Sequence, residues 1–203
     1  SLKSGATILG IGDAGGFRQF SNSVRMIRRP EDLKGLKMRS NGMDTINKTL
    51  EALGAEVMTV PYNDLYMALK SGAIDGQENP WVNSSGMRFY EVQKYFTEVN
   101  YQFHPEPFYV NTRWYESLPS EYQEILAECT EEMMKENNRL IDENEVQAME
   151  NIRANAEIYT LSREERQAFV EATQVVYEEY MDNGLLTMDD LARMKRIIRG
   201  EEK

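Results

Sequence analysis

The sequence has only one cysteine, Cys129, and one histidine, His104, among its 203 residues. A single cysteine excludes an intrachain disulfide, and so few thiol and imidazole groups exclude a clustered Cys/His zinc site. A histidine-dependent catalytic triad would have to use His104, and no serine stands in a Gly-x-Ser-x-Gly motif. These absences remove whole classes of chemistry, and we expect no metal site.

Long apolar runs are also missing. No segment approaches the roughly 20 residues that a membrane-spanning helix needs. The sequence begins SLKSGATILGIG, without the basic segment and apolar stretch of a signal peptide. Either the protein never had one, or this is a mature form or a fragment. The hydrophobic fraction of 41% predicts a folded core, and the length suits one large domain or two small lobes.

Basic residues are in the minority, and the net charge is −11. This disfavours nucleic acid and anionic membranes as partners, because both bind a positive surface. The charge is uneven, since residues 1–48 carry nine basic and four acidic residues. Such a basic island can hold an anion, because two arginines are enough to bind a carboxylate. Composition alone favours the other interpretation, an ordinary solvated surface paired with acidic residues elsewhere.

Apolar runs and helical patterns alternate over the first part of the chain. We expect strands at residues 6–12, 36–40, 56–60 and 73–77, with helices at 43–53 and 64–71. Glycines at 12, 15 and 16 are expected to end the first strand, Gly54 and Gly72 to end the two helices, and Asn63 to cap the second. This order predicts an α/β lobe with a largely parallel sheet.

The later part of the chain changes character. Residues 81–95 are expected to form a helix after a turn at Asn79–Pro80, and residues 97–112 to be extended. Residues 120–183 contain no glycine or proline, and a helix over 120–155 would be about 50 Å long, enough to cross between two bodies. A strand at 157–161, a helix opened by a Ser162/Glu165 capping box and ending at 183–184, and a last helix capped by Thr187 are expected to follow.

Several segments resemble, in collinear order, the DctP-type solute-binding proteins of TRAP transporters. They are GFRQFSNSVRMI, PEDLKGLKMR, LGAEVMTVPYNDLYMALKSGAIDGQENP, FYEVQKYF and WYESLPSEYQEI. The most specific is SGAIDGQENP with YNDLYMAL upstream. The resemblance implies a bilobal α/β clamp of the periplasmic-binding-protein type (type II), with a mixed, largely parallel sheet, a long inter-lobe helix and C-terminal helices.

Members of that family carry a first α/β lobe and a signal peptide before the point where this chain begins. The resemblance therefore implies a chain that lacks most of the N-terminal lobe. It divides the chain into an end of the N-terminal lobe or hinge strand (1–16), a second α/β lobe with the anion site (17–118), the inter-lobe helix (119–156) and a C-terminal strand and helices (157–203).

The resemblance assigns ligand contacts to four residues. Arg39 matches the arginine that holds the ligand carboxylate, a role in which a planar guanidinium donates two parallel hydrogen bonds. Arg18 matches a second arginine reaching the same ligand, Asn79 a ligand-binding asparagine, and Tyr62 an aromatic packed on the ligand's carbon skeleton. Each residue also has an alternative interpretation. Arg39 would form a surface salt bridge and Arg18 a hinge-side salt bridge, whereas Asn79 would belong to a simple turn and Tyr62 to ordinary core packing.

Four further residues are possible cleft residues. Trp81 either narrows the pocket or covers the start of a helix. Glu78 is expected to support the site rather than to touch ligand. His104 and Tyr101 lie on the extended segment that the resemblance places beside the cleft, where a lone histidine is more often part of the scaffold.

The function implied by the resemblance is periplasmic capture of an organic acid and its delivery to membrane permease subunits. No bond is made or broken, so the resemblance implies a protein that is not an enzyme, with no catalytic residues and no cofactor. Which acid cannot be read from the residues, because the family takes dicarboxylates, sugar acids and keto acids. An effector-binding domain of a cytoplasmic regulator with a similar fold is the alternative, and an acid–base enzyme using Asp75 or Glu78 with His104 is a weak third. A bare lobe should expose apolar surface, so we expect a dimer or exchanged segments.

Overall fold

The computed structural model describes residues 5–198 and 200–201, and by packing the chain divides into two units. Unit 1 comprises Ser1–Val24 and Glu78–Thr160, and unit 2 comprises Arg25–Gln77 and Leu161–Lys203. Residues 1–4 of the expected first segment, and Arg199, Glu202 and Lys203 of the last one, lie outside the described residues. The four-part division expected from the resemblance is a different partition, and it stays a prediction.

Unit 1 is built on a long, bent strand. β1 (Ala6–Asn22) pairs antiparallel with β6 (Phe103–Asn111) and with β5 (Tyr95–Glu98), and β5 pairs in parallel with β7 (Glu157–Thr160). The expected end of the first strand at its glycines is wrong. Gly15 (φ 130°) and Gly16 (φ 84°) instead bend the strand, because both adopt backbone angles that other residues rarely reach.

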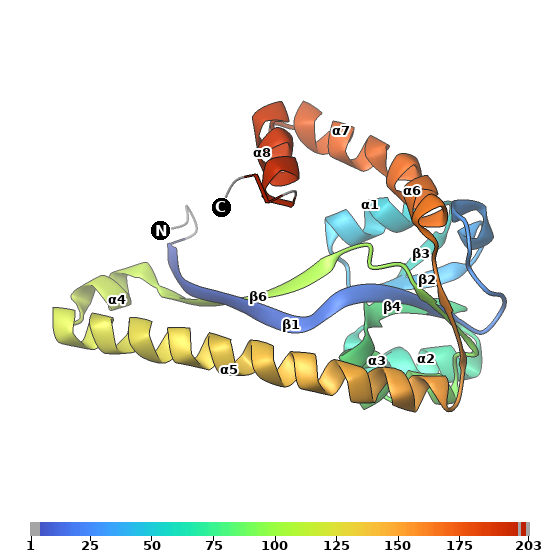
Figure 1. Cartoon of the computed structure of the whole chain (residues 1–203), viewed down its shortest axis with the longest axis horizontal. Coiled ribbons are helices and arrows are strands. Elements are labelled where there is room, and N and C mark those ends of the chain that lie inside the picture. Colours follow the sequence, from blue (N-terminus) through green and yellow to red (C-terminus); the bar gives the residue numbers. More distant parts are fainter. Residues whose placement is uncertain (1–4, 199, 202–203) are drawn as a thin grey trace. The chain divides into compact units, whose positions relative to one another are not determined.

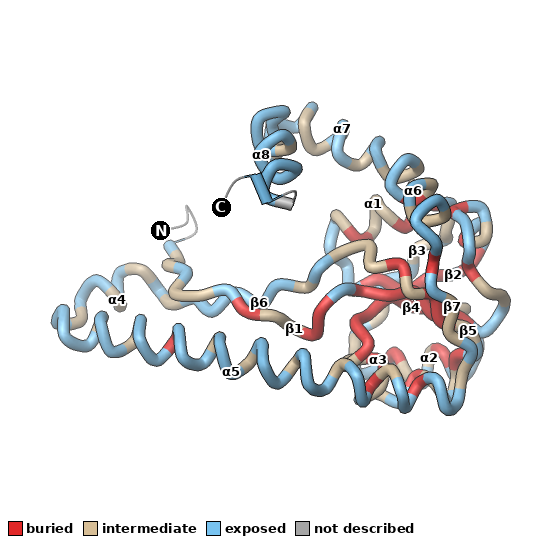
Figure 2. The backbone as a smooth tube through the Cα atoms, viewed as in Figure 1, coloured by how far each residue is buried: buried red, intermediate tan, exposed pale blue. Residues whose placement is uncertain are grey.

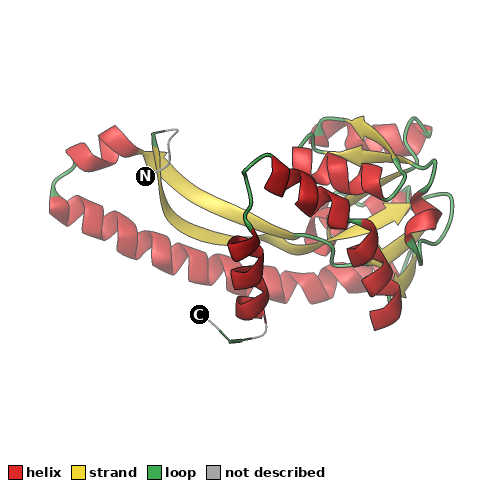
Figure 3. Cartoon of the chain, turned by 90° about the horizontal axis from the view of Figure 1, so that it is seen from above, coloured by secondary structure: helices red, strands yellow, loops and turns green. Residues whose placement is uncertain are grey.

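A long helix runs along β1 in unit 1 (Figures 1 and 3). α5 (Ser120–Arg153) has 34 residues, which corresponds to about 51 Å, and it confirms the helix expected at 120–155. At two points where α5 approaches β1, the strand residue is a glycine. A Cβ at Gly10 would lie 2.9 Å from Thr130, and one at Gly12 would lie 2.6 Å from the Met134 sulfur. These two glycines therefore permit the close approach. α4 (Thr112–Ser117) precedes α5.

The segment from 76 to 95 differs from the sequence expectation. β4 (Gly76–Pro80) begins later than residue 73 and includes Asn79–Pro80, which was expected to be a turn. The helix expected at 81–95 is broken into α3 (Trp81–Gly86) and a 3-10 turn, η3 (Phe89–Glu91). Arg88 between them adopts a left-handed conformation (φ 55°), which no helix continues through.

Unit 2 contains the parallel part of the fold. β2 (Lys37–Ser40) pairs in parallel with β3 (Glu56–Thr59) and with β4. α1 (Asp44–Ala52) and α2 (Leu65–Ser71) end at positive-φ glycines, Gly54 and Gly72, as expected. Asn63 does not cap α2, because a 3-10 turn, η2 (Tyr62–Asp64), occupies the position before it. η1 (Pro30–Leu33) leads into β2.

Three helices complete unit 2: α6 (Arg163–Ala172), α7 (Gln174–Asp182) and α8 (Met188–Ile198). The Ser162/Glu165 capping box is confirmed, and Thr187 exchanges hydrogen bonds with Asp190 at the start of α8. The helix expected to run to 183 is interrupted at Thr173, whose hydroxyl donates to the Phe169 carbonyl (2.9 Å). The Lys48 ammonium on α1 pairs with Glu179 on α7.

The fold class is confirmed as α/β with a mixed, mostly parallel sheet. Within unit 1, burial gathers at the end of β1, around β5 and under α3, whereas the first half of β1 and most of β6 are exposed or half-buried (Figure 2). Over the residues that the structure describes, no helix is both long and apolar enough to cross a membrane.

Candidate functional site

Arg18 lies on the buried second half of β1 and is only 1% exposed. Its Nε donates to Glu78 Oε2, and its Nη2 donates to Glu78 Oε1 (2.9 Å), to the Glu78 carbonyl (3.0 Å) and to Asn79 Oδ1 (3.2 Å). The Nη1 atom lies 3.1 Å from His104 Nδ1. These contacts use four of the five N–H groups of a guanidinium.

Glu78 cancels the charge of Arg18. It is 0% exposed, and its carboxylate grips the guanidinium in the two-pronged geometry of an arginine–carboxylate pair. Burial alone would lower the pKa of Arg18, but the hydrogen bonds and charge of Glu78 more than offset it and raise the pKa. Arg18 therefore offers a directed hydrogen bond more than a net charge. The expected supporting role of Glu78 at a ligand site stays a prediction.

Tyr101 and His104 complete the Arg18 cluster. The Tyr101 hydroxyl donates to Glu78 Oε2, and burial together with the nearby Glu78 carboxylate raises the pKa of Tyr101 well above its usual value. The Arg18 guanidinium can only donate, so Nδ1 of His104 must accept and the ring is neutral. Burial and the Arg18 charge both lower the pKa of His104, which agrees with that assignment.

Asn79 and Trp81 follow on β4 and α3. Asn79 is 4% exposed and accepts from Arg18. Trp81 is 1% exposed and stacks on Phe96, with ring centroids 6.1 Å apart, in a core cluster with Ala148 and Ile152. The indole therefore covers the helix start in the core of unit 1, the second of the two expectations for it.

Arg39 and Tyr62 lie in unit 2. Arg39 is near the carboxyl end of β2 and is 3% exposed; its Nε donates to the Val60 carbonyl (2.9 Å). Its guanidinium carbon lies 5.9 Å from the centre of the Tyr62 ring, a cation–π distance. Tyr62 begins η2, just after β3. The carboxyl ends of neighbouring parallel strands are where α/β sheets bind ligands.

The structure thus brings the predicted residues together in two groups. Arg18, Glu78, Asn79, Tyr101 and His104 form one cluster in unit 1, and Arg39 with Tyr62 forms a pair in unit 2. Gln77 of β4 pairs in register with Arg39, and Asn79 follows two residues later on the same strand. Sequence reasoning missed that Glu78 pairs with Arg18 and accepts from Tyr101, because nothing in the spacing of residues 18, 78 and 101 reveals these contacts.

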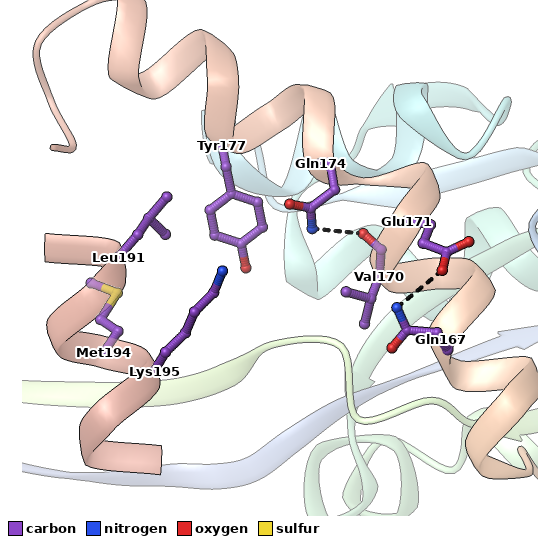
Figure 4. Close-up of a pocket in the computed structure, with 8 residues that line it drawn as sticks. All are labelled: Gln167, Val170, Glu171, Gln174, Tyr177, Leu191, Met194 and Lys195. Carbon is purple, nitrogen blue, oxygen red and sulfur yellow. Dashed lines mark hydrogen bonds between the residues drawn. The ribbon is translucent and has the colours of Figure 1, made fainter. Parts of the chain in front are cut away.

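A separate pocket lies between α6, α7 and α8 of unit 2 (Figure 4). Its volume is about 380 Å³, and Tyr177, Leu191, Met194 and Lys195 are among its lining residues. Two of its polar side chains are already paired, since Gln174 donates to the Val170 carbonyl and Gln167 to Glu171. None of the predicted ligand residues lines it. Within the described residues, no group of three or more His, Cys, Asp or Glu side chains is placed to hold a metal ion.

Comparison with known proteins identifies relatives over most of the chain. Residues 2–183 match the family model DctP, described as "Bacterial extracellular solute-binding protein, family 7". The C4-dicarboxylate-binding periplasmic protein DctP of Vibrio cholerae is 31% identical over 81% of this chain and 50% of its own length. The chain thus spans about half the length of the curated relatives it matches first.

Solved structures agree with the fold. A TRAP periplasmic solute-binding protein from Shewanella oneidensis with bound succinate has a TM-score of 0.82 and 29% identity, over 89% of this chain and 59% of that one. A second, from a Sulfitobacter species with bound β-D-galacturonate, has a TM-score of 0.83 and 28% identity over the same shares. Both of those ligands carry carboxylates.

Proposed function

We propose that this chain, which belongs to the DctP family of bacterial extracellular solute-binding proteins, carries the carboxylate-binding residues of a TRAP-type solute-binding protein. Its role is to capture an organic acid outside the cytoplasmic membrane and to present it to membrane permease subunits. It binds and releases the acid without making or breaking a bond.

The observation that carries this proposal is the burial of Arg39 near the carboxyl end of β2, with the Tyr62 ring at cation–π distance. A guanidinium at 3% exposure has lost most of its contact with water, so a carboxylate that pairs with it gains more than at an open surface. In our proposal the acid's carboxylate binds Arg39, and its carbon skeleton packs on Tyr62.

We also propose Arg18 and Asn79 of unit 1 as ligand contacts. Glu78 pairs with Arg18, so this arginine brings hydrogen-bond donors rather than a full net charge. A guanidinium and a side-chain amide suit the carboxylate and hydroxyl oxygens of an organic acid. A dicarboxylate and a sugar acid both meet this description, so the ligand class is an organic acid.

The proposal includes a location and partners. The periplasm and the permease subunits follow from the family, and relatives named as periplasmic support them. Exposed apolar side chains on β1 and β6, such as Ile11 (61%) and Tyr109 (63%), support our further proposal that this chain alone forms dimers or exchanges segments.

Calorimetry with succinate and D-galacturonate tests the site. We expect weak binding of at least one acid by the 203-residue chain, and its loss in Arg39→Ala, because truncation leaves a desolvated carboxylate unpaired at a cost of about 2–5 kcal/mol. Arg39→Lys should restore little, since an ammonium lacks the planar pair of donors. Lys70→Ala, at an exposed position on α2, is the matched control. Unchanged affinity in Arg39→Ala would contradict the assignment.

A further inference from the structure

The bend in β1 lies just before Arg18, at a break in the β1–β6 pairing. The β1–β6 register is unbroken from Gly10 to Asp13, opposite Pro105, and resumes only at Phe17, opposite Phe103. Between them stand Gly15 and Gly16, both with positive φ. Glycines restrict the backbone less than any other residue, so other contacts must set the angle of this bend.

One set of contacts comes from Asp13 itself. Its carboxylate oxygen Oδ1 accepts from the Gly15 amide (2.8 Å) and from the Gly16 amide. The bend also packs against the start of α3, since a Cβ at Gly15 would lie 2.9 Å from Pro80 and 2.5 Å from Asn83. These contacts fix the inside of the bend.

The other contacts come from two adjacent asparagines of α5. Asn137 Nδ2 donates to the Asp13 carbonyl (2.6 Å), and Asn138 Oδ1 accepts from the Asp13 amide (2.9 Å). The two side chains together satisfy both backbone groups of one residue. Their amide orientations are fixed by chemistry, because a carbonyl can only accept and a backbone N–H can only donate.

The two asparagines belong to one face of α5, and successive side chains of this face lie against successive parts of β1. Thr130 and Met134 lie against Gly10 and Gly12, and the Glu145 carboxylate comes within 3.4 Å of a Cβ placed at Gly16. Spacings of three, four and seven or eight residues put these side chains on a single side of a helix. Asparagine is a poor residue for a helix interior, so two in succession need a reason other than helix formation.

We propose that Asn137 and Asn138 act together as a latch on the β1 bend and are positioning residues for Arg18. By gripping Asp13 on both sides they hold the first half of β1 at a fixed angle to the half that carries Arg18. The inference depends on the proposed function only for its consequence on ligand affinity, since the latch itself is a property of the ligand-free chain.

Nuclear magnetic resonance on the 203-residue chain tests the latch directly. In Asn138→Ala we expect the Asp13 amide to exchange with solvent about tenfold faster, as loss of an ordinary hydrogen bond implies, and the Gly15 and Gly16 amides to follow. The Nε–H resonance of Arg18, which reports its pairing with Glu78, should shift in the same variant. Asn144→Ala is the control, because that side chain bonds only to Leu140 of its own helix among the described contacts.

Aspartate variants distinguish a directional latch from general damage. Asn138→Asp keeps an acceptor for the Asp13 amide, so exchange should stay near wild type. Asn137→Asp loses the donor to the Asp13 carbonyl and sets a carboxylate against that carbonyl, so the exchange rate of the Asp13 amide should rise. The two changes add the same charge one residue apart, and both can be compared at equal global stability. Succinate affinity should fall in Asn137→Asp and not in Asn138→Asp.

Two results would overturn the latch. One is wild-type exchange at Asp13, Gly15 and Gly16 with an unmoved Arg18 resonance in Asn138→Ala. The other is an equal effect of the two aspartate variants. If the exchange and resonance changes appear but no acid binds any variant, the latch stands and the proposed function fails.

Discussion

At position 18 the chain buries an arginine and surrounds it with a carboxylate, an amide oxygen and an imidazole nitrogen. Removing one partner from such a cluster is costly, because the remaining charge stays buried without its counterpart. The arrangement explains why residues 78, 101 and 104 accompany Arg18. They orient it and neutralise it, whichever ligand the protein binds.

The Tyr101 hydroxyl has a measurable effect on stability. Tyr101→Phe removes the hydrogen bond to Glu78 and should lower the free energy of unfolding by about 1.5–3 kcal/mol, the range for bonds to charged groups. Urea denaturation measures the change. Tyr109→Phe is the matched control, because Tyr109 is on the same segment, 63% exposed and without a hydrogen bond from its hydroxyl among the described contacts. Equal effects of the two substitutions would contradict the assigned role.

His104 should make stability depend on pH. Its pKa is lowered in the folded chain by burial and by Arg18, although Glu106 and Asp13 act in the opposite direction. The unfolded chain therefore binds the proton more readily, and stability should fall as pH drops below about 6.5, the unperturbed value. Thermal unfolding between pH 7.5 and 5 measures this fall.

The control for that pH dependence is His104→Asn. Its side-chain oxygen accepts from Arg18 near the place of Nδ1 and does not titrate. We expect the variant to lose much of the decline below pH 6.5 that the parent shows. A decline of the same size in both proteins would assign it to carboxylates elsewhere in this acidic chain.

Among the elements, β1 and α5 depend on each other. The strand bends at glycines, and the helix fits against it because Gly10 and Gly12 have no side chains. A pattern of glycines is easily interpreted as the end of a strand, but here the glycines mark a bend within one strand. The strand β1 continues through its bend. β6 pairs with residues of β1 on both sides of the bend, and β5 pairs with the last residues of β1.

Gly15→Ala tests how tightly the bend is packed. The new Cβ would meet Pro80 at 2.9 Å and Asn83 at 2.5 Å, at a backbone angle of φ 130° that alanine rarely adopts. We expect a loss of about 2–4 kcal/mol in the free energy of unfolding, from strain and overpacking together. Gly86→Ala is the control, since nothing lies within 4 Å of its Cβ position. A loss below 1 kcal/mol in Gly15→Ala would show that the bend adapts, contrary to its packing.

On the scale of the whole molecule, both units expose large apolar side chains, and in unit 1 several of them lie on the paired strands β1 and β6. Ile8, Ile11, Phe108 and Tyr109 on β1 and β6 are 38–63% exposed, and Trp114 beside them is 49% exposed. Clusters of this kind promote association in water. Sedimentation velocity should show a dimer of the 203-residue chain at micromolar concentration.

Substitution can locate the surface responsible. Ile11→Lys with Tyr109→Lys should shift the chain toward monomer, because both side chains are more than 60% exposed and contribute little to the core. Met67→Lys, at 62% exposure on α2 of unit 2, is the control. A compact monomer in the parent chain would contradict the proposed association.

The sequence by itself determined the α/β class, the long helix, the helix ends at Gly54 and Gly72, and the family. These depend on local signals: hydrophobic periodicity, the freedom of glycine to adopt positive φ, and long collinear motifs. It also named Arg18, Arg39, Asn79 and Tyr62 as ligand residues, which stays a prediction. Only the tertiary structure decided that Glu78 pairs with Arg18 and accepts from Tyr101, that Trp81 is in a core, and that Asn137 and Asn138 hold Asp13. Each of those contacts joins residues from 15 to 125 positions apart for which no local pattern selects the partner, so only the folded chain brings them together.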